Sequence, residues 1–189
     1  MAVTTLDPHT ALIVIDLQKG IVAYPTAHPI ADVLAHAGAL AGAFRRQRQP
    51  VVLVNVTGAA PGRSEQARRP GERPADWADL VPELDRQAGD HTVSKQTWGA
   101  FSGTDLLAHL EKNRVTQVVL AGVATSIGVE STARQAYELG FNVTLAIDAM
   151  TDTSADAHAN SVARIFPRLG ETGSSAQIIA LLEGGATAT

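Results

Sequence analysis

One stretch of the chain decides the fold: Val118-Val-Leu-Ala-Gly-Val-Ala-Thr-Ser-Ile-Gly-Val-Glu-Ser-Thr-Ala-Arg-Gln-Ala-Tyr-Glu-Leu-Gly140. It begins with an apolar run that ends at Gly122, which is typical of a buried strand followed by a tight turn. Apolar side chains then recur at helical spacing up to the glycine that ends the stretch. The carboxyl end of a strand therefore meets the amino end of a helix, where unpaired N–H groups and the helix dipole favour a negative charge.

The same alternation of strands and helices continues on both sides of this stretch. Apolar runs predict strands at 11–15, 51–56, 92–94, 117–121 and 142–147. Helical spacing predicts further helices at 30–49, 104–113, 155–166 and 175–182, with room for a short strand between the last two and a short helix near 77–84. Such alternation predicts a three-layer α/β/α fold with a Rossmann-like, mostly parallel sheet of about six strands. A ligand site is then expected where the strand order reverses, between the first and fourth strands.

The composition excludes several classes of protein. The 189 residues are 45% hydrophobic, so we expect a single domain over residues 1–189, with a flexible tail from about 184. A formal charge of -4 argues against nucleic-acid binding. No stretch approaches the roughly 18 apolar residues of a membrane span, and no basic flank precedes an apolar core at the start. We therefore expect a cytoplasmic protein with a small-molecule substrate.

Two charged residues follow or end predicted strands. Asp16 follows the first strand directly, where a carboxylate is costly to bury unless it has a partner or a chemical role. The alternative is an aspartate that forms a turn or caps a helix. Lys95 ends the third strand, and an ordinary surface lysine is the alternative there. Beside the carboxylate, this ammonium group would hold it ionised and would neutralise charge on a substrate.

Three segments together resemble the isochorismatase-like family, also called cysteine hydrolases. They are Asp16-Leu-Gln18, Ser94-Lys-Gln-Thr-Trp-Gly-Ala-Phe-Ser102 and Gly122-Val-Ala-Thr-Ser-Ile-Gly-Val-Glu-Ser-Thr-Ala133. The resemblance implies that Asp16 is a general acid or base, that Lys95 assists it, and that a cis peptide bond joins Val123 to Ala124. At the position of the family's nucleophilic cysteine this chain has Gly128, and it contains no cysteine anywhere. Thiolate attack is therefore excluded.

The missing nucleophile leaves two hypotheses. The first is an isochorismatase-like hydrolase that acts through Asp16 and water, as the resemblance implies for isochorismatases proper, which cleave a vinyl ether without a cysteine. The second is a catalytically silent relative that binds a small carboxylic or amide ligand or serves as an assembly subunit. Gly128 marks either a tight turn or a space for substrate or water, and the two are compatible. A hydroxyl nucleophile from Thr125, Ser126 or Ser131 is not expected, because no histidine is evidently placed beside them.

Further candidates would surround a substrate. Gln18 belongs to the segment that resembles the family's first motif, and Ala124 and Thr125 belong to the turn. Trp98 and Phe101 are candidates for apolar pocket walls, with core packing as the alternative.

The long irregular segment 57–87 carries arginines that are candidates for binding a substrate carboxylate, with a solvated basic loop as the alternative: Arg63, Arg68, Arg69 and Arg73. Arg63 is the first choice among them. No metal and no other cofactor are expected, because Asn55-Val-Thr57 stands where the nicotinamidase branch has Asp-x-His. Family members are commonly homo-oligomers, so the resemblance implies at least a dimer.

Overall fold

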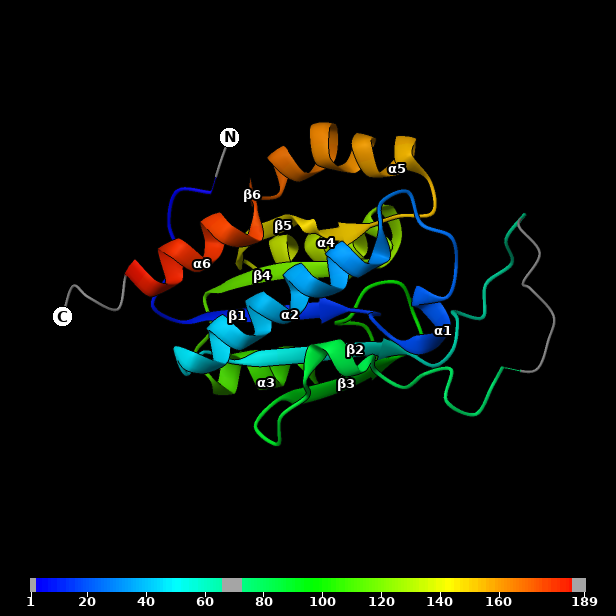
Figure 1. Cartoon of the computed structure of the whole chain (residues 1–189), viewed down its shortest axis with the longest axis horizontal. Helices are drawn as coiled ribbons and strands as arrows, with labels where there is room; N and C mark the ends of the chain where they lie inside the picture. The colour runs from blue at the N-terminus through cyan, green and yellow to red at the C-terminus, as the bar shows by residue number, and fades with distance from the viewer. Residues whose placement is uncertain (1–2, 66–72, 185–189) are drawn as a thin grey trace.

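The computed structural model describes residues 3–65 and 73–184. Its centre is a parallel sheet of six strands in the order β3-β2-β1-β4-β5-β6 (Figure 1). The strands are β1 (Thr10–Ile15), β2 (Val51–Val56), β3 (His91–Lys95), β4 (Gln117–Val123), β5 (Asn142–Thr151) and β6 (Glu171–Gly173). The α/β fold predicted from the sequence, with a parallel sheet of about six strands, is confirmed.

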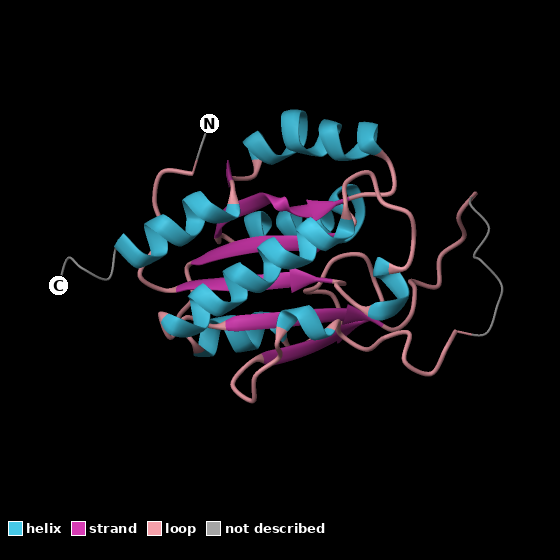
Figure 2. Cartoon of the chain, viewed as in Figure 1, coloured by secondary structure: helices cyan, strands magenta, loops and turns pink. Residues whose placement is uncertain are grey.

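Helices cover both faces of this sheet (Figure 2). The helices are α1 (Lys19–Val22), α2 (Ile30–Arg46), α3 (Leu106–Lys112), α4 (Glu130–Glu138), α5 (Ala155–Asn160) and α6 (Ser175–Gly184). α2 and α6 lie on one face, α3 and α4 on the other, and α5 lies beyond β5 at the edge (Figure 1). Every residue of β1 and β4 is buried, as expected for apolar central strands covered on both sides. None of the described helices is long and apolar enough to cross a bilayer.

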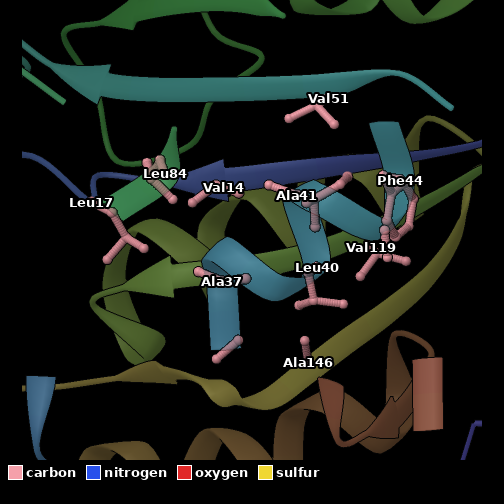
Figure 3. Close-up of a cluster of buried hydrophobic side chains, with 14 of the residues drawn as sticks. Val14, Leu17, Ala37, Leu40, Ala41, Phe44, Val51, Leu84, Val119 and Ala146 are labelled. Carbon is pink, nitrogen blue, oxygen red and sulfur yellow. The ribbon is translucent and has the colours of Figure 1, made fainter. Parts of the chain in front are cut away.

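The core on the α2 face shows why this helix forms and where it packs. Leu40 and Phe44 of α2 are fully buried and lie in one cluster with Val14 of β1 and Val119 of β4 (Figure 3). Side chains of this size each stabilise the fold by about 1.5–3 kcal/mol when buried. The small side chain of Ala37, on the same face of the helix, lets α2 approach the sheet closely. α2 thus fixes β1 and β4, which carry the ends where a site is expected.

Three elements differ most from their predicted bounds. β5 is ten residues long, and its register against β4 shifts between Leu120 and Gly122, so the extra residues form a bulge. Asp148 therefore lies inside β5 rather than at its end, and its carboxylate accepts hydrogen bonds from the backbone and hydroxyl of Ser175 at the start of α6. The predicted helix at 155–166 is an α-helix only up to Asn160, and Ser161–Ile165 continue it as a π-helix. Within 77–84, only Pro82–Leu84 form a helical turn.

The ends of β1 and β4 meet at the point where the strand order reverses. Gly122 has φ 118°, and a Cβ atom there would overlap the carbonyl group of Ile15. Only glycine permits both this backbone conformation and this approach. As a result, Asp16 after β1 and the turn after β4 face one another. The tail predicted from about 184 falls almost wholly on 185–189, outside the described residues.

Candidate active site

Asp16 and Lys95 form a buried ion pair at this edge. Lys95 Nζ lies 2.8 Å from Asp16 Oδ2 and also donates to the carbonyl oxygen of Thr97 at 3.0 Å. The lysine and aspartate side chains are 2% and 8% exposed, so neither is a surface residue. Because β2 lies between β1 and β3, the long lysine side chain has to span the end of β2 to reach the carboxylate. Asp16 has φ 52°, a left-handed conformation that aspartate tolerates better than most residues.

Burial dominates the electrostatics of Asp16. It raises the pKa of this carboxyl group from 3.8 to about 6, and the charge and hydrogen bond of Lys95 offset only part of the effect. The second oxygen, Asp16 Oδ1, is buried and has no hydrogen-bond partner among the described residues. Leaving a buried carboxylate oxygen without a donor is costly. A bound water molecule or substrate group would supply that donor.

Gly128 lies beside this pair. A Cβ atom built on it would be 2.9 Å from Ile15 Cγ2, 3.3 Å from Asp16 Oδ2 and 3.5 Å from the carbonyl oxygen of Val123. The first distance is too short for an unshifted Ile15 side chain, so the glycine allows tight packing. The second shows that the missing side chain leaves a space next to the carboxylate. Both interpretations of Gly128 are therefore compatible with the geometry.

A cavity of about 320 Å³ opens in front of these residues. Apart from the ion pair, its wall is mainly apolar and aromatic, and includes Ile21, Tyr24, Val56, Trp77, Trp98 and Ile127. Small-molecule sites have this character: a concave apolar wall with a few polar groups that fix orientation. Among the described residues, no group of three or more histidine, aspartate or glutamate side chains is arranged to hold a metal ion.

The structure separates the predicted binding residues into two groups. Trp98, which is 67% exposed, and Ala124 line the cavity. Phe101 instead packs in the core, with its ring centroid 6.1 Å from that of Phe141, as the alternative interpretation had it.

Gln18 also lies outside the lining of the cavity. Its side-chain amide is fully buried; it donates to the carbonyl oxygens of Val56 and Trp77 at 3.1 and 3.2 Å and accepts from Val56 N at 2.7 Å. The side-chain amide is therefore engaged by backbone groups of neighbouring segments. Gln18 thus joins the end of β1 to the end of β2 and to the loop at Trp77, so it positions the cavity wall rather than forming it.

Among the arginines of the long segment, Arg73 lines the cavity and Arg63 does not. The guanidinium carbon of Arg73 lies 4.0 Å from the ring centroid of Trp77, and Nη1 donates to the carbonyl oxygen of Thr57 at 3.2 Å. No carboxylate in the described parts of the chain pairs with Arg73. Arg63 is exposed, and the other two candidates, Arg68 and Arg69, lie outside the described residues.

Two other aromatic residues of the wall were not predicted from the sequence. Tyr24 and Trp77 lie in irregular segments that are distant in the chain, and each lines the cavity. The available signal was composition: a large aromatic side chain within a polar, proline-rich segment needs an apolar surface to pack on. Which surface it finds depends on how the loops fold back.

The turn after β4 is held from its outer side. Ser126 N and Oγ donate to Asp152 Oδ2, each at 2.8 Å, and Thr125 Oγ1 lies 2.9 Å from His158 Nδ1. The histidine comes from α5, 33 residues further along the chain, and sequence inspection did not place one here. Thr125 is fully buried and does not line the cavity, so this pairing does not supply an exposed nucleophile.

The backbone amides of the turn are partly committed. Ile127 N and Val129 N both donate to the carbonyl oxygen of Ala124, and the amide of residue 126 is bound by a carboxylate. The amides of residues 126, 127 and 129 are therefore already hydrogen-bonded within the protein and are not available to a bound anion. The peptide bond between Val123 and Ala124 is cis, as the resemblance implied.

Comparison with known proteins gives this geometry a context. The family model described as the isochorismatase domain matches residues 10–177, a span that contains Asp16, Lys95 and Gly128. The chain belongs to the isochorismatase family. The uncharacterised isochorismatase family protein YwoC of Bacillus subtilis (strain 168) is 43% identical over 170 residues, which cover 86% of this chain and 88% of YwoC.

A second isochorismatase family protein, the uncharacterised YecD of Escherichia coli O157:H7, is 41% identical over 179 residues, covering 90% of this chain and 94% of YecD. A solved structure of an isochorismatase family protein from Burkholderia thailandensis superposes with a TM-score of 0.91 at 40% identity, covering 95% of this chain and 98% of that one. The family, its α/β fold and a hydrolase-like character are therefore shown for this chain.

Proposed function

We propose that this isochorismatase family protein hydrolyses a small molecule without a cysteine nucleophile, by proton transfer at Asp16 and attack by water. The observation that carries the proposal is the carboxyl group of Asp16, which lines the cavity and has one buried oxygen, Oδ1, without a donor among the described residues. The raised pKa of this carboxyl group, about 6, supports a role in which it takes up and releases a proton near neutral pH.

The neighbouring residues suit the same chemistry. A water molecule in the space at Gly128 would be close to Asp16, which removes a proton from it as the oxygen attacks the substrate. Asp16 then returns this proton to the leaving group as the bond between that group and the attacked carbon breaks. While Asp16 is neutral, the charge of Lys95 is no longer balanced and can offset negative charge that develops on the substrate. The amides of Ala124 and Gly128 are the further candidates for that charge. Arg73 would bind a carboxylate of the substrate, while the aromatic wall contacts its apolar part.

Turnover tests the proposal with three proteins in parallel: the wild type, Asp16→Asn and Gly128→Cys. The substrates are isochorismate and a small panel of other vinyl ethers, amides and activated esters. We expect the wild type to convert at least one of them. Asp16→Asn should react about 10²- to 10⁴-fold more slowly, which is the usual contribution of a general acid or base. Equal slow conversion by wild type and Asp16→Asn would reject the proposal.

A catalytically silent binding protein is the second candidate, and the absence of any cysteine favours it. In that case the wild type converts nothing, a small carboxylic or amide ligand binds in calorimetry, and Gly128→Cys gains cleavage of an amide or ester. The new thiol would lie beside Asp16, since the Cβ position is 3.3 Å from Oδ2. Alternatively, the catalytically silent protein serves as a subunit of an assembly.

We further propose that this protein is a homo-oligomer, that its chain folds as a single domain, and that it is cytoplasmic. Light scattering at micromolar concentration measures the first: we expect at least a dimer, and the mass of one 19.7 kDa chain would contradict it.

A further inference from the structure

Two histidines lie behind the cavity wall and do not line it. His28 belongs to the segment between α1 and α2, and His158 belongs to α5. Their ring centroids are 4.5 Å apart, with the ring planes tilted by 60°. Neither residue has a role in the proposed reaction, yet each is hydrogen-bonded to a segment that forms the site.

The first of these contacts reaches the turn after β4. His158 Nδ1 lies 2.9 Å from Thr125 Oγ1, and Thr125 is fully buried. Thr125 directly follows Ala124 and lies three residues before Gly128, both of which line the cavity. A displacement of the imidazole ring would therefore be transmitted to the backbone that borders the substrate space.

The second contact reaches the opposite wall. His28 N and Nδ1 lie 3.2 and 2.9 Å from Thr151 Oγ1 at the end of β5, and Thr26 Oγ1 donates to the carbonyl oxygen of His28 at 2.8 Å. Thr26 and Tyr24 of the same segment line the cavity. The two histidine rings thus join the two walls of the site from behind.

We propose that His158 is a positioning residue of the active site: through Thr125 it sets the turn Thr125–Val129, and through its contact with His28 it fixes that turn against the segment whose residues Tyr24 and Thr26 line the cavity. The effect of His158 on catalysis rests on the proposed function, because it requires that the protein is an enzyme. The physical coupling between the ring and the turn does not depend on it.

The charges around His158 make the coupling sensitive to pH. Burial lowers the pKa of this histidine, the neighbouring His28 lowers it further, and Asp152 at the end of β5 acts in the opposite direction. On the side of α4, Glu130 accepts a hydrogen bond at 2.6 Å from Ser161, which follows α5 directly. The turn itself, residues 125–129, contributes no titratable side chain. A neutral His158 can accept the Thr125 hydroxyl hydrogen at Nδ1, whereas a protonated ring must donate there.

Nuclear magnetic resonance tests the coupling without any substrate. In the wild type, the backbone amide signals of residues 125–129 should shift with the same midpoint as the His158 ring, below the ordinary value of 6.5. Thr125→Val removes the hydroxyl group at nearly constant volume. In this variant the ring should still titrate, while the amide shifts that follow it should disappear.

Turnover supplies the second measurement. His158→Leu should lower kcat by roughly 10- to 100-fold, because small displacements of reacting groups have effects of this order, and should change KM far less. His158→Asn keeps a hydrogen-bonding group near the Nδ1 position and should restore most of kcat. Both His158→Asn and Thr125→Val remain informative if His158→Leu fails to fold.

His109 provides the matched control. It also lies on a helix, stacks on a second histidine, His91, with ring centroids 3.8 Å apart, and has a pKa lowered by burial. It lies near the start of β3, at the opposite end of the sheet. His109→Leu should leave kcat and the amide signals of 125–129 unchanged.

The outcomes separate the two proposals. Amide signals of 125–129 that ignore the His158 titration, or that respond equally to His109→Leu, overturn the positioning role. A normal kcat in His158→Leu also overturns it. A third outcome is that the wild type converts no substrate, while its amide signals follow the His158 titration and cease to do so in Thr125→Val. This result supports the coupling between His158 and the turn and rejects the proposed function.

Discussion

Two ion pairs, one buried and one partly buried, lie at opposite ends of the strands of the same sheet, and they are built differently. At the carboxyl edge, Asp16 meets Lys95 through one oxygen, Oδ2, at 2.8 Å. At the amino edge, Arg45 binds both oxygens of Asp90, with Nε 3.0 Å from Oδ1 and Nη2 2.7 Å from Oδ2. The second pair is further bonded: Arg45 also donates to the carbonyl oxygen of Leu84, and Asp90 accepts from Gln87 N.

The difference teaches how to distinguish a structural pair from a reactive one. Both oxygens of Asp90 have donors, so this pair is complete and joins α2 to the loop before β3. One oxygen of Asp16 has none among the described residues, and the residue lines a cavity of small-molecule size. Burial of an incomplete pair costs stability. The cost is understandable where the open position receives a ligand.

The largest effect should come from Lys95→Met, which removes the cation of the incomplete pair. Asp16 would then lose its counter-charge, its pKa would rise above about 6, and the carboxylate needed as a base would be scarce at neutral pH. We expect kcat/KM at pH 7 to fall by about 10²-fold or more. The apparent pKa of the pH–rate profile measures the cause, and an unchanged profile would contradict it.

Arg45→Met is the matched change in the complete pair. It leaves Asp90, 3% exposed, without its cation, and breaking a buried pair in this way costs about 3–5 kcal/mol of stability. Because the Arg45 side chain is 18% exposed, we expect the lower end, about 3 kcal/mol. Urea unfolding measures this loss, and kcat should stay at the wild-type value. A loss of kcat without a loss of stability would remove the distinction between the two pairs.

The pH dependence of Asp16 sharpens the comparison. Its folded pKa, about 6, is higher than the ordinary 3.8, so the folded state holds this proton more tightly. Its contribution to stability, about 3 kcal/mol at most, is present below pH 3.8 and is lost as pH rises through about 6. Base-catalysed turnover should rise over the same interval.

Unfolding free energies of wild type and Asp16→Asn, measured from pH 4 to pH 8, isolate this contribution because asparagine does not titrate. The wild type should lose stability relative to the variant as pH increases. A difference that stays constant across the range would show that the carboxyl group has no raised pKa.

The smallest effect should come from Arg73→Lys. Lysine keeps the positive charge but loses the planar group that stacks on Trp77 and that binds a carboxylate through two hydrogen bonds. For a substrate with a carboxylate we expect KM to rise about tenfold, which corresponds to about 1.4 kcal/mol, with kcat unchanged. The methyl ester of the same substrate is the control, since it should show no such change.

Much of the fold follows from local patterns in the chain. Apolar runs and helical spacing predicted the strands and the long helices, and their alternation predicted the parallel sheet and the reversal point between β1 and β4. The predicted end of the fifth strand was wrong, because β5 continues past Asp148 to Thr151. Asp148 caps α6 instead of ending the strand. A cap formed by a residue 27 positions away has no local signature.

The candidate site was predictable only in part. Asp16 was proposed because it adjoins the end of a predicted strand, and Lys95 because its segment, at another strand end, resembles the second motif of the family. Arg63 was preferred to Arg73, although Arg73 lines the cavity and Arg63 does not, because both lie in one irregular segment whose path depends on tertiary packing. His158 was missed since its partner lies on another element.

The sequence by itself determined the order of strands and helices, the absence of a thiol, and the glycine beside the predicted acid. These are properties of neighbouring residues, of their spacing and of composition. Only the tertiary structure decided that Asp16 Oδ1 lacks a donor, that Phe101 packs in the core, and that a histidine from α5 holds the turn after β4. Burial, hydrogen bonding and pKa depend on contacts between segments distant in the chain, and those contacts exist only once the sheet and its helices have packed.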